Sequence, residues 1–353
     1  MTALGGSVLG EDVIAAMGEA ARRHVVMDDL IAAAGREIAR ATGTEDGCPT
    51  TGAAAGVAIA VAAVVAGTDL SRIEALPDAG DAPCEVILAR GHAVHFGAPV
   101  RQMIALGGGR PVEVGSVNKV TAAHLSGAIG PRTAALLYVQ SHHAVQKGTV
   151  TLAETVEVGR RHGVPVIVDA AAEEDLRRWP ATGADLVVYS GGKAVGGPTS
   201  GLICGSAARM AACRAQYQGI ARPMKVGKET LFGLVQALRA YGDAAPANHR
   251  ARMEKLAARL AALPGLTTRV TTDEAGRAIH RTELTVDPAG AGRDAARLTA
   301  ELAAHGIHLR DHQASTGRLY IDPRPLRPDE EERLVDRLTA LLTGNSSAEG
   351  EGR

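Results

Sequence analysis

The sequence predicts an α/β protein in which a large domain with a mostly parallel sheet is followed by a small α+β domain. Between residues 84 and 205, short apolar segments with little alternation are separated by helical segments. Such segments are typical of parallel strands that helices cover on both faces. From about residue 245 the pattern changes to a mixture of helices and short strands. The length of 353 residues is sufficient for two domains.

The bulk composition argues against nucleic-acid and membrane partners. The formal net charge is −1, so no overall field attracts polyanions, and 2% aromatic residues leave few platforms for stacking bases. The longest apolar run, residues 54–66, is shorter than the roughly 20 residues that span a bilayer. The four cysteines show no paired spacing, which is typical of free thiols in a reducing compartment. A cytoplasmic protein is therefore expected.

The elements of the large domain follow from periodicity and end signals. Residues 11–41 are alanine-rich with interspersed charges and predict helix. A buried helix is predicted after Thr51, which is a plausible N-cap, and residues 151–163 predict a helix closed by Gly163. Strands are predicted at 84–90, 111–115, 134–140, 164–170, 185–190 and 200–205.

The small domain is predicted to begin with a helix that ends at Pro264-Gly265. Its further elements are strands at 267–272, 280–287 and 317–322 and helices at 292–304 and 328–343. We therefore expect an N-terminal arm over 1–15, a large domain over 16–244, a small domain over 245–343 and a polar, disordered tail over 344–353.

The ends of two successive predicted strands carry Asp169 and Lys193, and ligands of open α/β sheets bind at such ends. Alone, Asp169 could cap a helix and Lys193 could be a surface lysine. A phosphate loop is excluded, because Ala194 follows the lysine where that motif needs serine or threonine. A Schiff-base lysine for pyridoxal phosphate, with Asp169 keeping the ring nitrogen protonated, explains both residues and the surrounding glycines.

Other residues near predicted strand ends fit the same cofactor. The helix start at Thr51, Gly52 and Ala53 offers backbone N–H groups to a phosphate, and Ser190 adds a hydroxyl. His92 follows the first of the six predicted strands and could stack on the pyridine ring or be a structural histidine.

Two adjacent histidines, His142 and His143, follow another predicted strand. Neighbouring side chains do not converge on one ion, and no carboxylate completes a site, so no metal is expected. A role in proton transfer or substrate contact is the alternative that we favour.

With these residues assembled, the chain resembles the fold-type I pyridoxal-phosphate enzymes, in the branch of selenocysteine synthase (seryl-tRNA selenium transferase) and D-glucosaminate-6-phosphate ammonia-lyase. The most specific segment is "VPVIVDAAAEEDLRRWPATGADLVVYSGGKAVGGPTSGLICG". "TALGGSVLGEDVIAAM", "TTGAAAGVAIA", "YVQSHHAVQKG" and "RPMKVGKET" extend the match over roughly residues 2–240. The tRNA-dependent members carry an extra N-terminal region, for which this chain has no room.

The resemblance implies a large domain with a mostly parallel seven-stranded sheet, a bound pyridoxal phosphate and at least a homodimer with sites at the subunit interface. It implies that Lys193 bonds the cofactor aldehyde, Asp169 partners the pyridine nitrogen and His92 stacks on the ring. The implied phosphate cradle is Thr51, Gly52, Ala53 and Ser190, with Ser141 a weaker candidate. The implied substrate-binding residues are Arg324, which could equally be a solvated arginine, and the basic cluster that contains Arg222 and Lys225.

The expected activity is that of a lyase on an amino acid or amino sugar acid. After an external aldimine forms, Lys193 would remove the α-proton, and the α-carbanion would expel a β-substituent and then release ammonia. Racemisation or epimerisation, with His142 or His143 as second acid, and β-replacement or aldol cleavage start from the same carbanion. A catalytically silent binding subunit is the non-enzymatic alternative, against which the presence of both Lys193 and Asp169 argues.

Overall fold

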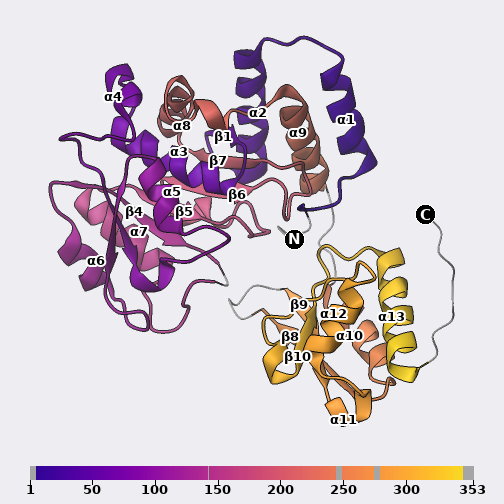
Figure 1. The fold of residues 1–353 in the computed structure, drawn as a ribbon. Helices are drawn as coiled ribbons and strands as arrows, with labels where there is room; N and C mark the ends of the chain where they lie inside the picture. The colour runs from indigo at the N-terminus through magenta and orange to yellow at the C-terminus, as the bar shows by residue number, and fades with distance from the viewer. Residues whose placement is uncertain (1–4, 142, 244–248, 274–278, 345–353) are drawn as a thin grey trace. The chain divides into compact units, whose positions relative to one another are not determined.

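The computed structural model describes residues 5–141, 143–243, 249–273 and 279–344 (Figure 1). The chain forms two compact units, one over residues 1–244 and the other over 245–353. Each unit has its own sheet and its own hydrophobic core.

Within the described part of the first unit, seven strands form one sheet in the order β1-β7-β6-β5-β4-β2-β3. Strand β7 runs antiparallel to β1 and β6, and all pairs among β2 to β6 are parallel. The bounds are β1 Asp46–Thr50, β2 Glu85–Ala89, β3 Arg110–Val114, β4 Thr133–Val139, β5 Val166–Asp169, β6 Leu186–Ser190 and β7 Gly201–Gly205. The mostly parallel seven-stranded sheet is thus confirmed.

Helices cover both faces of this sheet (Figure 1). Side chains of β4 alternate between the faces, so that Leu137 and Val139 pack in one core and Leu136 and Tyr138 in the other. The helices of the first core are α3 (Ala53–Ala66), α4 (Leu70–Ala75), α5 (Val100–Leu106) and α8 (Ala207–Ala215). Those of the second are α1 (Glu11–Ala21), α2 (Met27–Thr42), α6 (Ala122–Ala128), α7 (Leu152–His162) and α9 (Lys228–Asp243). No helix in the described ranges is long and apolar enough to span a bilayer.

The N-terminal helical region differs from the single helical stretch expected over 11–41. The first helix ends at Ala21, and the second begins at Met27 after an extended Val26. The expected arm boundary between residues 15 and 16 falls inside α1. This helix packs on α9, where Asp12 Oδ2 accepts a hydrogen bond from Gln236 Nε2 at 2.9 Å. The region therefore belongs to the compact first unit from residue 11 onward.

The C-terminal unit packs an antiparallel sheet, in the order β10-β9-β8, with helices around one leucine-rich core. Its elements are α10 (His249–Leu260), β8 (Leu266–Thr272), β9 (His280–Val286), α11 (Pro288–Ala291), α12 (Ala295–Ala303), β10 (Arg318–Ile321) and α13 (Pro328–Thr343). Asp294 caps α12 by accepting from the N–H of Arg297 at 2.7 Å, so this helix starts three residues later than expected. Gly344 ends α13, and residues 345–353 lie outside the described part of the chain.

A buried carboxylate, Asp322, holds two arginines of the C-terminal unit. Its Oδ2 accepts from Arg281 Nε at 2.8 Å and from Arg324 Nη2 at 2.7 Å, and its Oδ1 accepts from Arg324 Nε at 2.8 Å. Burial alone would raise the pKa of Asp322, but Arg324 and Arg281 outweigh it and hold this pKa well below its usual range. Arg324 is therefore oriented by a bidentate ion pair within its own unit.

Replacing Asp322 by asparagine is expected to lower the free energy of unfolding by about 3 kcal/mol, because Arg281 would lose a charged partner in a buried setting. Since the folded-state pKa lies below the unfolded one, the carboxylate's contribution is present above the unfolded value and is lost as the pH falls through the folded one. Urea unfolding at neutral and acidic pH measures both effects. Asp336→Asn, at an exposed position of α13, is the control, and equal stability of the two variants would contradict the prediction.

Candidate active site

Asp169 ends β5 at the carboxyl edge of the large sheet. In register it pairs with Val139 on β4 and Val188 on β6, and its carbonyl oxygen accepts from the N–H of Gln140 at 2.8 Å. The side chain is buried. The sequence predicts this carboxylate at a strand end, and the structure puts it at the carboxyl end of the central strand, the edge at which ligands of open α/β folds bind.

The pKa of Asp169 reflects two opposing influences of its surroundings. Burial raises the pKa of its carboxyl group, while the N–H of Ala171, 3.1 Å from Oδ1, and the charge of Lys193 lower it. The net shift is upward. A buried carboxylate with a raised pKa is stabilised by a positive partner, and the protonated ring nitrogen of pyridoxal phosphate is such a partner. Lys193 is close enough for its charge to lower the pKa of Asp169.

Lys193 lies in a tight loop between β6 and β7. The N–H of Gly191 donates to the carbonyl of Ser200 at 2.8 Å, and the N–H of Gly197 donates to the carbonyl of Gly191 at 2.8 Å. A Cβ on Gly191 would lie 2.2 Å from Ser200 Oγ, and Gly196 has a φ of +72°. The glycines around the lysine thus allow the loop to fold back on itself.

His92 lies beside this edge in a short 3-10 turn after β2 and is buried. Its Nδ1 accepts from the N–H of Val139 at 3.2 Å, so the ring proton belongs on Nε2. The ring meets Tyr138 edge-on, with 4.6 Å between centroids. Burial lowers the pKa of His92 to about 4, so the imidazole is neutral at physiological pH. His95, by contrast, is exposed.

The residues predicted to form a phosphate cradle lie at the ends of neighbouring strands and at the start of α3. Thr50 of β1 pairs with Gly201 of β7, which in turn pairs with Ser190 of β6. Helix α3 follows β1 directly and begins at Ala53, with Gly52 as N-cap. The expected N-cap, Thr51, is therefore wrong by one residue. Gly52 makes no side-chain hydrogen bond to the first N–H groups of the helix, which is compatible with a phosphate at this helix start.

Gly201 lies directly against the start of α3, a contact that the sequence did not reveal. A Cβ at this position would lie 2.5 Å from the carbonyl carbon of Gly52 and 2.8 Å from the nitrogen of Ala53. Only a glycine lets β7 pass so close to the start of α3. The available signal was a glycine at the first position of an otherwise apolar strand.

Gly201→Ala is expected to weaken cofactor binding by about tenfold, because the added methyl must push the start of α3 away from its place. Titration of cofactor-free protein with pyridoxal phosphate, followed by absorbance, measures the dissociation constant. Gly127→Ala on α6, where a Cβ would meet nothing within 4 Å, is the control. An unchanged dissociation constant for Gly201→Ala would show that the start of α3 does not hold the cofactor.

The turn after β4 contains the predicted Ser141, His142 and His143. Ser141 Oγ accepts from the N–H of His143 at 3.2 Å, and His143 is exposed. His142 lies outside the described residues. Over the residues that are described, no three His, Cys, Asp or Glu side chains gather as a metal site would require.

The predicted substrate residues lie on two units. Arg222, in a 3-10 turn, and Lys225, directly after it, are exposed on the first unit. Arg324 belongs to the second unit, where it pairs with Asp322. Their substrate roles stay predictions.

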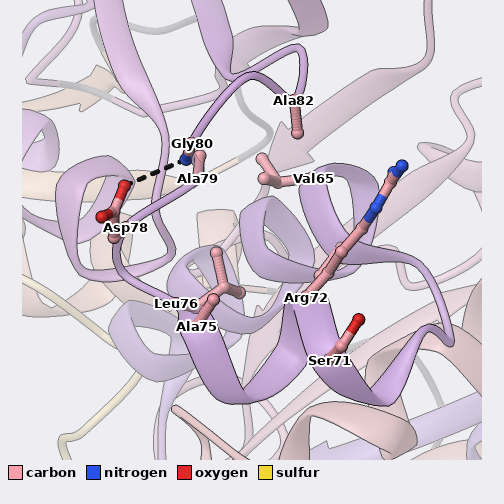
Figure 2. Close-up of a pocket in the computed structure, with 10 residues that line it drawn as sticks. Val65, Ser71, Arg72, Ala75, Leu76, Asp78, Ala79, Gly80 and Ala82 are labelled. Carbon is pink, nitrogen blue, oxygen red and sulfur yellow. Dashed lines mark hydrogen bonds between the residues drawn. The ribbon is translucent and has the colours of Figure 1, made fainter.

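A cavity of about 200 Å³ lies away from all these residues (Figure 2). The end of α3, helix α4 and the following loop enclose it, and its wall is mostly alanine, valine and leucine. Ser71, Arg72 and Asp78 are its polar members, and Figure 2 shows Asp78 accepting a hydrogen bond from the N–H of Gly80. No predicted site residue lines it.

Comparison with known proteins places this geometry in context. A sequence profile described as SelA: L-seryl-tRNA selenium transferase matches residues 1–324. A 5'-C-glycyluridine monooxygenase-decarboxylase from Streptomyces sp is 58% identical over 356 residues, with coverage of 98% of this chain and 89% of the relative. A D-glucosaminate-6-phosphate ammonia lyase from Salmonella typhimurium (strain 14028s / SGSC 2262) is 45% identical over 343 residues, with coverage of 97% and 93%.

The structure agrees with the sequence comparisons. The solved structure of D-glucosaminate-6-phosphate ammonia-lyase superposes with a TM-score of 0.90 at 44% identity, covering 98% of this chain and 95% of the other. The expected resemblance, the fold-type I architecture and the pyridoxal-phosphate cofactor are thereby confirmed.

Proposed function

Because the chain belongs to the L-seryl-tRNA selenium transferase family of pyridoxal-phosphate enzymes, we propose that it is an ammonia-lyase that acts on an amino acid or amino sugar acid by β-elimination. The observation that carries this proposal is the buried Asp169 with Lys193 within electrostatic reach. The similarity to an ammonia lyase at 45% identity supports the elimination. When bound, the cofactor supplies an electron sink for the substrate's α-carbon.

Each residue of the site has a defined task in this proposal. Lys193 Nζ would hold the cofactor through its aldehyde, and its amine would take the α-proton of the substrate as general base. Asp169 keeps a proton on the ring nitrogen. His92, neutral and with its proton on Nε2, covers the ring without adding a charge that would compete with Asp169.

The remaining residues bind the ends of cofactor and substrate. The phosphate is held by the start of α3, from Thr51 to Ala53, and by Ser190. Ser141 is a weaker candidate for the same role. Arg222, Lys225 and Arg324 bind anionic groups of the substrate, and His142 or His143 takes part in proton transfer or contacts the substrate.

A second candidate is oxygenation coupled to decarboxylation of a glycine-type amino acid. The observation that favours it is 58% identity to a monooxygenase-decarboxylase over 98% of this chain. Both reactions need the same electron sink, but this one consumes dioxygen and releases carbon dioxide, whereas the elimination does neither.

Product analysis separates the two candidates. The enzyme is incubated aerobically with phosphorylated amino sugar acids and with a nucleoside that carries a glycyl group, while ammonia, dioxygen and carbon dioxide are followed. Ammonia with a keto acid and no dioxygen uptake supports the lyase. Dioxygen uptake with carbon dioxide supports the second candidate, and racemised substrate without either product would contradict both.

The proposal also includes the compartment and the oligomeric state of the enzyme. We infer a cytoplasmic homodimer, or a higher oligomer, that acts on small molecules and not on nucleic acid. Light scattering of the purified protein gives its mass, and a monomer with full activity would contradict interfacial sites.

A further inference from the structure

We propose that Ser7 is a positioning residue that fixes the backbone of the lysine loop, residues 190–200. Ser7 Oγ donates to the carbonyl oxygen of Lys193 at 2.8 Å, and the N–H of Ser7 donates to the carbonyl of Gly192 at 3.2 Å. Two segments 186 positions apart in sequence are thus joined at the lysine itself. The proposal rests on the proposed role of Lys193 as cofactor lysine.

The two residues before Ser7 make this approach possible. Gly5 and Gly6 have φ angles of +86° and +102°, a region that other residues rarely adopt. A Cβ on Gly6 would lie 3.2 Å from the carbonyl oxygen of Gly192, closer than most real contacts. The Gly-Gly-Ser stretch therefore has the conformation and the clearance needed to lie against the lysine loop.

The segment after Ser7 is anchored to the body of the first unit. Leu9 packs against the hydrophobic core, and Val13 of α1 is buried in it. Asp12 also bonds Gln236 of α9. Since α1 is packed against the core and bonded to α9, the hydrogen bond of Ser7 connects a fixed helix to the lysine loop.

The hydrogen bond from Ser7 Oγ fixes the backbone at Lys193, to which the lysine side chain is attached. The carbonyl of Lys193 accepts from Ser7 Oγ and, within the loop, from the N–H of Gly196 at 3.1 Å. Without the hydroxyl, the carbonyl of Lys193 loses a contact that comes from outside the loop and keeps its contact with the N–H of Gly196. The Lys193 amine would then sample more positions relative to Asp169, with which it interacts electrostatically.

Ser7→Ala and Ser7→Thr test the proposal on the holoenzyme. Loss of one hydrogen bond is expected to lower kcat roughly two- to tenfold with little change in KM, since substrate contacts stay. The Ser7→Ala substitution is also expected to shift the pH midpoint of the bound cofactor's visible absorbance, because the Lys193 amine changes its position relative to the charge of Asp169. Threonine keeps the hydroxyl and is expected to restore both.

Hydrogen exchange of the cofactor-free protein gives an independent readout. In Ser7→Ala the amides of residues 191–197 are expected to exchange roughly two- to tenfold faster, with no change in the sheet. Ser126→Ala, which removes a hydroxyl bonded to His162 Nε2 on the surface, is the control. An unchanged pH midpoint and unchanged loop exchange would overturn the positioning role, as would faster exchange spread over the whole unit.

This design separates failure of the inference from failure of the proposed function. If Lys193 does not bond the cofactor, Lys193→Ala keeps the visible band of the wild type. The exchange experiment needs no cofactor, so it still decides whether Ser7 holds the loop.

Discussion

Lys193→Ala is expected to give a protein without the visible absorbance of the wild type and with turnover lower by about 10³-fold or more. The substitution removes both the amine that bonds the cofactor aldehyde and the base that takes the α-proton. The start of α3 and Asp169 remain, so the variant is expected to bind the cofactor non-covalently and to contain phosphate after dialysis. Absorbance spectra, phosphate content and single-turnover rates measure the three expectations.

A lysine elsewhere serves as the matched control. Lys255 is exposed on α10, so Lys255→Ala should keep both colour and rate. Primary amines added to Lys193→Ala should restore part of the rate, since they can replace the missing base in the emptied space. A variant that keeps the visible band and the wild-type rate would remove Lys193 from the mechanism.

The strands of the first unit could be predicted because most are continuous apolar runs with sharp ends. Val166–Asp169 and Leu186–Ser190 are runs of buried apolar residues, mostly β-branched, that end in a polar residue. Burial on both faces leaves such a segment few alternatives to a central strand. The same sharp ends predict that Asp169 and Lys193 lie at one edge of the sheet, since parallel neighbours end at the same edge.

Strand β1 could not be predicted, because two of its residues have a low propensity for strands. Gly47 and Pro49 lie within its five residues, and both are depleted in strands. An edge position tolerates the proline, and the glycine is required by packing, since a Cβ on Gly47 would lie 2.4 Å from Ile38 Cβ of α2. Tertiary contacts thus decide this strand.

The missed parts of the site share a similar cause. Gly201 is needed because β7 passes the start of α3, and Ser7 reaches the lysine loop from the other end of the unit's sequence. Neither relation leaves a local pattern of charge or periodicity. The sequence thus indicated the ionisable groups at strand ends, whereas the close approaches that position them needed three-dimensional coordinates.

Asp169→Asn is expected to lower kcat and, in the cofactor-free protein, to raise the free energy of unfolding. Asparagine keeps the size and can still accept from the N–H of Ala171, but it cannot hold a proton on the ring nitrogen. The electron sink is then weakened, and kcat is expected to fall by about 100-fold or more, equal to about 3 kcal/mol in the barrier. The visible band should remain, because Lys193 still bonds the aldehyde.

The cofactor-free form of this variant is expected to be more stable than the wild type at neutral pH. Burial raises the folded-state pKa of Asp169 above its unfolded value, so stability is lost as the pH rises through the folded pKa, and asparagine does not incur that loss. Asp185→Asn is the control at the opposite end of a neighbouring strand, where Oδ2 accepts from the N–H of Val166 at 2.9 Å. It should lower stability slightly and leave kcat unchanged. A cofactor-free Asp169→Asn less stable than the wild type would mean that the carboxylate is held by the protein alone, and the argument for a cationic ring beside it would fail.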